Sequence, residues 1–181
     1  MMDDSDSRLL WIYAGMHQIR HPNIVDVEAS GFGGLSYPIE VGLSMACGKR
    51  YCALIKPDPH WTHWDKSAES VHGISREMLA EKGKPVCTVA DELNCLLDGE
   101  AVYTDGWVVD EPWMIRLFDA AKVRRGFRMY DIQTIMSESQ MDHWHSVKKH
   151  VMKQLKLTRH RASNDARIIQ ETFVQSAGVT Q

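Results

Sequence analysis

Two acidic residues, Asp26 and Glu28, stand two positions apart in the largely apolar segment 24–30. Side chains alternate along a strand, so both carboxylates would point from the same face. Neighbouring carboxylates in an apolar setting repel each other and resist desolvation unless a divalent cation or a shared proton compensates them. Hard cations such as Mg²⁺ prefer carboxylate oxygens, so we expect a metal site here. The alternative for so short a pattern is a strand edge with both acids in water.

Three further residues, Asp110, His160 and Asp165, could complete such a site. Asp110 lies between a predicted strand and a predicted helix, which is where open α/β sheets place their sites. On one continuous helix, five positions would separate the side chains of His160 and Asp165 by about 140°. The two side chains therefore converge only if His160 lies on the turn before the helix.

In order and spacing, these segments resemble the DEDDh group of the DnaQ-like 3′→5′ exonucleases, which includes ribonuclease T and the DNA polymerase III proofreading subunit. Asp26-Val27-Glu28-Ala29-Ser30-Gly31 resembles the first motif, D-x-E-x-T/S-G. Val71-His72-Gly73-Ile74-Ser75 is similar to an H-G-I-T/S segment common in these enzymes. His160-Arg161-Ala162-Ser163-Asn164-Asp165 resembles the third motif. The resemblance covers nearly the whole chain after residue 22.

The middle motif departs from the family's pattern, H-N-x-x-F-D. The best alignment is Asp105-Gly106-Trp107-Val108-Val109-Asp110. Asp110 then takes the place of the metal-binding aspartate, while Asp105 and Gly106 replace the family's His and Asn. Two aspartates could thus be the third ligand. Asp110 is favoured, and Asp105 would then position the loop or the substrate strand.

The resemblance implies phosphodiester hydrolysis with two Mg²⁺ or Mn²⁺ ions. Two cations about 3.5–4 Å apart neutralise the attacking and the leaving oxygen together. In the family's scheme Asp26 would bridge both ions, and Glu28 and Asp165 would complete the ion site that activates water. Asp110 would help to hold the second ion. His160 would take the proton from the attacking water, a task that suits a group titrating near neutrality.

Binding a single-stranded 3′ end requires stacking surfaces and basic contacts to the backbone. Phe32 directly follows the first motif and is expected to meet the terminal base. Trp61 and Trp64 are further candidates, although each could equally belong to the core. Residues 147–167 carry seven Lys and Arg and one acid, a pattern that fits either a phosphate-binding surface or a solvated helix face. From this run we expect substrate contacts by Lys148, Lys149 and Arg161.

The sequence pattern around these residues predicts an α/β fold. Residues 24–30, 39–47 and 49–56 are expected to form three antiparallel strands. Two further strands, at 101–103 and 127–135, are expected to alternate with helices at 75–83, 88–97, 111–122, 140–155 and 161–176. The resemblance implies that this arrangement is an RNase H-like mixed five-stranded sheet flanked by helices.

The length of 181 residues suits one domain, 23–181, preceded by an N-terminal extension, 1–22. The apolar run at 9–16 is too short to span a bilayer, so we expect a cytoplasmic protein with no membrane contact. The four cysteines form no C-x-x-C pair. They are therefore expected to be reduced and mostly buried.

These patterns bear on three possible functions. The first is a stand-alone exonuclease acting on the 3′ end of single-stranded RNA or DNA; the motifs do not choose between the two sugars. The second is a nucleic-acid-binding or polymerase-associated subunit with little activity, which the complete set of acids argues against. The third is a small-molecule phosphohydrolase, which the His160 to Asp165 spacing makes less suitable. A homodimer is suggested by family analogy alone.

Overall fold

The computed structural model describes residues 21–178 and contains one five-stranded sheet, ordered β3-β2-β1-β4-β5. The strands are β1 (Ile24–Ala29), β2 (Pro38–Ser44), β3 (Arg50–Leu54), β4 (Ala101–Thr104) and β5 (Arg128–Asp131). The first three strands pair antiparallel, whereas β1, β4 and β5 run parallel. The predicted mixed sheet is confirmed. All but the last two residues of the predicted extension 1–22 lie outside the described residues.

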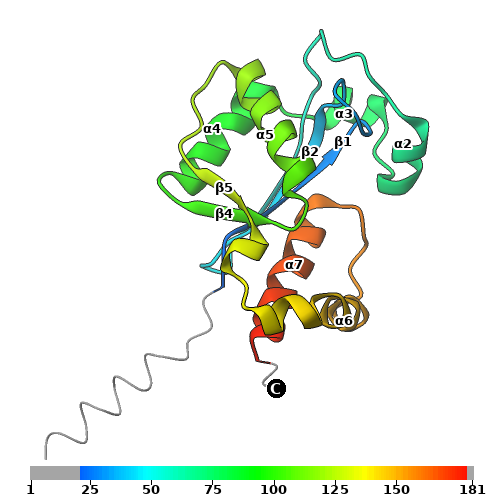
Figure 1. Ribbon diagram of the computed structural model, residues 1–181. Helices are drawn as coiled ribbons and strands as arrows, with labels where there is room; N and C mark the ends of the chain where they lie inside the picture. The colour runs from blue at the N-terminus through cyan, green and yellow to red at the C-terminus, as the bar shows by residue number, and fades with distance from the viewer. Residues whose placement is uncertain (1–20, 179–181) are drawn as a thin grey trace, which may run out of the picture.

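Helices cover both faces of this sheet (Figure 1). They are α2 (Lys66–His72), α3 (Arg76–Lys82), α4 (Val86–Leu97), α5 (Trp107–Ala121), the 3₁₀ helix η1 (Ile132–Ile135), α6 (Glu138–Leu155) and α7 (Ala162–Ala177). The helices α4 and α5 pack on one face, while α6 and α7 pack on the other. Within residues 21–178, no helix combines the length and the apolar character needed to cross a bilayer.

The central strand β1 is buried on both faces, and its alternation decides where the acids point. Val25 and Val27 belong to the main core, beneath α4 and α5. Ile24 instead belongs to a second cluster with Ile169 and Phe173 of α7. Since alternate residues share a face, Asp26 and Glu28 lie on the α7 side of the sheet.

Local polar side chains explain where several helices begin. Ser75 caps α3, because its hydroxyl accepts the backbone N–H of Met78 at 3.2 Å. The sequence pattern predicts no helix between residues 57 and 75, but α2 forms there. Its N-cap is Asp65, whose carboxylate accepts the N–H of Ser67 at 2.8 Å. A polar segment without apolar periodicity thus becomes helical through its cap.

The two largest errors in the predicted boundaries fall on β5 and α5. The strand expected at 127–135 ends at Asp131, whose side chain accepts the N–H of Gln133 at 2.8 Å and starts η1. The helix expected from residue 111 begins at Trp107, so Asp110 lies within its first turn.

The four cysteines are free, as expected, but all four are exposed, so the prediction that they are mostly buried is wrong.

Candidate active site

Most of the predicted site residues converge on one cavity of about 500 Å³. Those that line it are Asp26, Glu28, Phe32, Asp105, Asp110, Lys148, His160 and Asp165. The two remaining residues, Lys149 and Arg161, lie outside its lining. The structure therefore brings together the three acidic segments and the histidine that the motifs single out.

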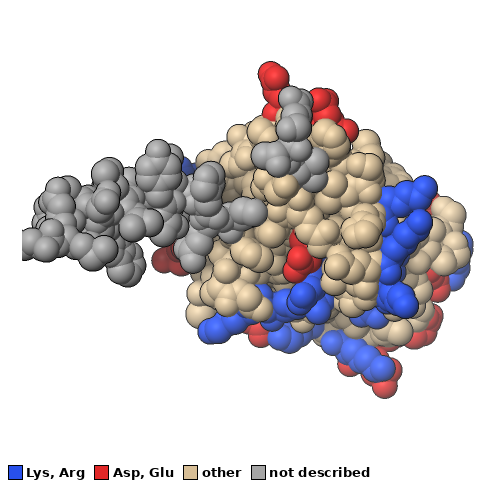
Figure 2. Space-filling view, turned by 90° about the horizontal axis from the view of Figure 1, so that it is seen from below, with Lys and Arg blue, Asp and Glu red and all other residues tan. Residues whose placement is uncertain are grey.

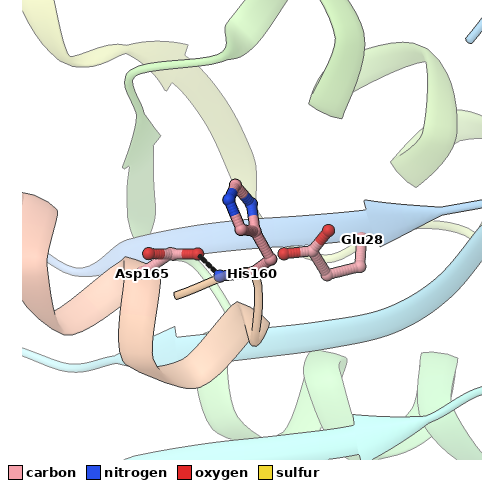
Figure 3. Close-up of side chains that lie close together, drawn as sticks. All are labelled: Glu28, His160 and Asp165. Atoms are coloured by element: carbon pink, nitrogen blue, oxygen red, sulfur yellow. Dashed lines mark hydrogen bonds between the residues drawn. The ribbon is translucent and has the colours of Figure 1, made fainter. Parts of the chain in front are cut away.

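The turn before α7 presents His160 and Asp165 to Glu28. His160 immediately precedes the N-cap Arg161 and has a left-handed backbone, with φ of +58°. Its backbone N–H donates to Oδ2 of Asp165 at 2.7 Å (Figure 3). One ligand atom from each of Glu28, His160 and Asp165 lies within 4.8 Å of the others. The expectation that His160 stands on the turn before the helix is confirmed.

Asp110 enters the cavity from the first turn of α5. Its side chain is only 4% exposed, and the hydroxyl of Thr104 donates to its carboxylate. Asp105, the other candidate for the third ligand, also lines the cavity but forms an ion pair with Lys148 of α6. The two aspartates thus occupy different settings, Asp110 buried among the acids and Asp105 held by a cation.

The carboxylates of this cavity are electrostatically strained. Burial is the main cause that raises the pKa of Asp26 well above its usual range, and the neighbouring charges of Asp110 and Glu28 add to it. Burial, with the charge of Asp165, also raises the pKa of Glu28 to about 7. Burial raises the pKa of Asp110 to about 8, although its bond from Thr104 acts in the opposite direction. The site therefore resists carrying its full negative charge.

This donor set fits divalent cations of the Mg²⁺ or Mn²⁺ class. Such ions take carboxylate oxygens, and their charge would relieve the repulsion that raises these pKa values. The residues that could hold them are Asp26, Glu28, Asp110 and Asp165.

Two cations of the chain also border the cavity. Nε of Arg159 lies 2.6 Å from Oδ1 of Asp165, and Lys148 pairs with Asp105. The sequence marks Arg159 only as one member of the basic run, because nothing in its spacing connects it with the acids. On the α6 side of the molecule, Lys and Arg side chains gather in bands rather than spreading evenly (Figure 2).

Part of the cavity lining is aromatic and apolar. Phe32 is 74% exposed, and its ring centroid lies 6.1 Å from that of the buried Trp113. His72, from the H-G-I segment, is buried, and its Nδ1 accepts the N–H of Ile74 at 3.0 Å. Its Nε2 has no hydrogen-bond partner within the described chain. In the neutral ring Nε2 must therefore carry the proton, which leaves a buried donor beside the cavity.

The glycine of the first motif has a steric role. Gly31 has φ of +139°, which L-residues with a side chain rarely adopt. A Cβ added to it would lie 2.7 Å from Cβ of Asp65. The chain can therefore turn sharply after β1, and this turn places Phe32 at the rim of the cavity.

Several predicted contacts lie elsewhere. Trp61 stacks on Tyr37 in the core, with ring centroids 5.1 Å apart. Trp64 donates from Nε1 to Glu69 at 2.6 Å and is not among the residues that line the cavity. Arg161 directs its guanidinium at the buried carboxylate of Glu40. Of the three aromatic candidates, Phe32 alone borders the site.

Comparison with solved structures tests this architecture. E. coli exonuclease I in complex with a dA16 oligonucleotide matches with a TM-score of 0.64 and 13% identity, covering 85% of this chain and 40% of that one. Exonuclease I from Methylocaldum szegediense matches with a TM-score of 0.61 and 14% identity, covering 84% and 40%. The chain therefore shares the RNase H-like fold of these exonuclease I structures. The resemblance found in the motifs is thereby confirmed at the level of the fold.

Other comparisons set the limits of this likeness. No protein-family model matches the sequence, and no curated protein sequence matches it. The chain spans about 40% of the length of the exonuclease I structures. An E. coli exonuclease I complex with single-stranded DNA is also known in a zinc-bound form; it matches with a TM-score of 0.64 and 14% identity, covering 85% of this chain and 40% of that one.

Proposed function

We propose that this chain is a metal-dependent 3′→5′ exonuclease that acts on single-stranded nucleic acid. The observation that carries the proposal is the convergence of Asp26, Glu28, Asp110 and Asp165 with His160 in one cavity. An exposed aromatic side chain, Phe32, borders that cavity, and the fold is shared with exonuclease I.

In this proposal the four acids hold two Mg²⁺ or Mn²⁺ ions, with Asp110 rather than Asp105 as the third ligand. The low exposure of Asp110 and its raised pKa support this choice. When bound, such ions supply positive charge to the phosphate and favour ionisation of water.

His160 accepts the proton of the attacking water. Its main chain is fixed by the bond to Asp165, while its ring makes no hydrogen bond to a residue between 21 and 178. The water oxygen bonds to phosphorus while the bond from phosphorus to the 3′ oxygen of the shortened strand breaks. That oxygen takes up a proton from solvent and becomes the new 3′-hydroxyl. The product is a nucleoside 5′-monophosphate. Arg159 lines the same cavity and can offset charge on the phosphate.

The terminal nucleotide would lie against the aromatic wall. The exposed ring of Phe32 offers a stacking surface that any base can use. Nε2 of His72 is a buried donor beside this part of the cavity, with no partner in the described chain. An unpaired 3′ end suits this surface, because a base without a pairing partner can turn its face to the ring of Phe32 without breaking base pairs.

A second cavity, of about 270 Å³, indicates where the next nucleotide would lie. It shares Asp105 and Lys148 with the first cavity. Its remaining lining is Ile132, Gln133, Met136, Met141, Trp144 and His145. It lies beyond the carboxyl ends of β4 and β5, the edge at which open α/β sheets bind ligands. We assign this space to the nucleotide on the 5′ side of the scissile phosphate.

The neighbours' own ligands suggest which substrate to test first. The exonuclease I complexes contain single-stranded DNA. Single-stranded DNA is therefore the first substrate to test, and single-stranded RNA is the second. Matched DNA and RNA oligonucleotides, together with a mononucleotide ester, would be incubated with the protein in Mg²⁺ or Mn²⁺. Release of nucleoside 5′-monophosphates from an oligonucleotide supports the exonuclease. Cleavage of the ester alone would favour a phosphohydrolase, and binding without cleavage would favour the binding subunit.

A further inference from the structure

A buried acid outside the predicted motifs, Glu40 of β2, is bound to the start of α7. Its side chain is 0% exposed. Arg161 donates to it three times, from Nη2 at 2.6 Å and from Nε at 3.1 and 3.2 Å. The backbone N–H of Ala162 donates to it at 2.8 Å. A buried carboxylate is tolerated only when such charged and hydrogen-bonding partners compensate it, so this position is strongly specified.

The neighbouring positions of β2 reinforce the attachment. Gly42 lies two residues along, on the same face, and a Cβ there would come within 2.1 Å of the backbone nitrogen of Ser163. Ser44, on the same face again, donates to Gln170 at 2.7 Å. The α7 side of β2 is therefore a close packing surface for α7, formed by Glu40, Gly42 and Ser44. No other residue would allow so close an approach at Gly42.

This packing surface sets the position of two candidate site residues. His160 directly precedes Arg161, and its N–H is bonded to Asp165 one turn further along. Glu40 is the cross-strand partner of Glu28, because the antiparallel register places the two residues opposite each other. Glu28 of β1 therefore lies opposite the residue that binds Arg161, which follows His160 in the turn before α7. His160 has a φ of +58°, which is unfavourable for a residue other than glycine, so surrounding contacts must hold its backbone.

We propose that Glu40 and Arg161 are a pair of positioning residues, which hold His160 and Asp165 at a fixed distance from Glu28. The inference rests on the proposed exonuclease function. Neither residue lines the cavity, so the pair acts through the site residues and not on the substrate. The pair also gives Arg161 a role other than the phosphate contact expected from the basic run.

The test compares Arg161→Gln and Glu40→Gln with Arg125→Gln. Arg125 makes a bidentate pair with Glu111, at 2.7 Å in both contacts, and neither residue lines the cavity. Both variants of the pair should lower kcat on the order of 10²-fold, with KM for the oligonucleotide changed less than about threefold, because a misplaced group mainly affects the chemical step. Arg161→Lys should recover part of kcat. Arg125→Gln should leave kcat within about twofold of the wild type.

Three outcomes would overturn the proposal. A raised KM with unchanged kcat, together with a weaker salt dependence of binding, would make Arg161 a substrate contact. Equal loss of activity in Arg125→Gln would indicate a general effect of losing an ion pair. Unchanged kcat in both Glu40→Gln and Arg161→Gln would remove the pair from the site altogether.

A readout independent of activity separates this proposal from the proposed function. If the wild-type protein cleaves no oligonucleotide, the function fails, but the position of His160 can still be observed by NMR. The Cε1–H resonance of His160 should move in Arg161→Gln and in Glu40→Gln, and it should stay in place in Arg125→Gln. An unchanged His160 resonance in both variants of the pair would contradict the positioning role.

Discussion

The backbone N–H of His160 donates a hydrogen bond of 2.7 Å to the carboxylate of Asp165. The candidate base and a candidate metal ligand are therefore held together before any substrate arrives. This bond uses the main chain of His160 and leaves its ring free. Changes to the ring can thus be separated from changes to the acid cluster.

We predict that His160→Asn abolishes most of the activity without disturbing metal binding. Asn tolerates the left-handed backbone of this position, and the bond from its N–H to Asp165 should persist. Loss of the general base should lower kcat by about 10²–10⁴-fold. The rise in Tm on adding Mg²⁺ or Mn²⁺ should match that of the wild type. A variant with normal kcat would exclude His160 as the base.

Phe32→Ala should weaken substrate binding with little effect on stability, because the ring is 74% exposed. Losing the stacking contact with one base should weaken the binding free energy by about 1–3 kcal/mol. Fluorescence anisotropy with a labelled oligonucleotide measures this change in affinity. Leu35→Ala is the matched control, since Leu35 lies on the same loop, is 73% exposed and does not line the cavity. Equal loss of affinity in the two variants would assign the effect to the loop and not to the ring.

Charge reversal at Lys148 and Lys149 should weaken binding most at low salt. Each lost phosphate contact should reduce the slope of log K against log salt by about 1. Lys148 borders the cavity, whereas Lys149 is exposed on α6 outside its lining, so the two should be changed separately. Lys82→Glu, on the exposed side of α3, is the control. An equal loss at every salt concentration would argue against a phosphate contact.

In chelator, Asp110→Asn should stabilise the protein at alkaline pH. Folding raises the pKa of Asp110 from an ordinary value of 3.8 to about 8, so the folded state favours the protonated acid. The contribution of Asp110 to stability is therefore complete below about pH 4 and is lost as the pH rises towards 8. Asn carries no charge, so the variant should gain at least about 1 kcal/mol at pH 8 and much less at pH 5. Urea unfolding at both pH values measures this; a variant less stable than the wild type at pH 8 would contradict it.

The sequence was sufficient for the parts of the site that local geometry controls. Alternation along β1 predicts that Asp26 and Glu28 share a face, and helical geometry places His160 on the turn before α7. Elements fixed by single polar side chains are harder to predict, and both α2 and the early end of β5 depend on an aspartate cap. Their segments lack the apolar periodicity on which such predictions depend.

Long-range pairs account for the rest. Glu40 is only one acid in an alternating strand, and its partner Arg161 lies 121 positions away. No short motif contains both residues, so only the folded chain reveals their contact. The same holds for Lys148 and Asp105, which are 43 positions apart. From the sequence, Lys148 and Asp105 are each expected at the substrate, whereas the fold also joins them to each other.

A time course with a 5′-labelled single-stranded oligonucleotide in Mg²⁺ or Mn²⁺ tests the central claim most directly, with Asp26→Ala and chelator as controls. We expect a descending ladder of products, shortened one nucleotide at a time from the 3′ end, that disappears in both controls. An undiminished ladder in Asp26→Ala would contradict the role of the acid cluster. An oligonucleotide that is bound but never shortened by the wild-type protein would contradict the exonuclease itself.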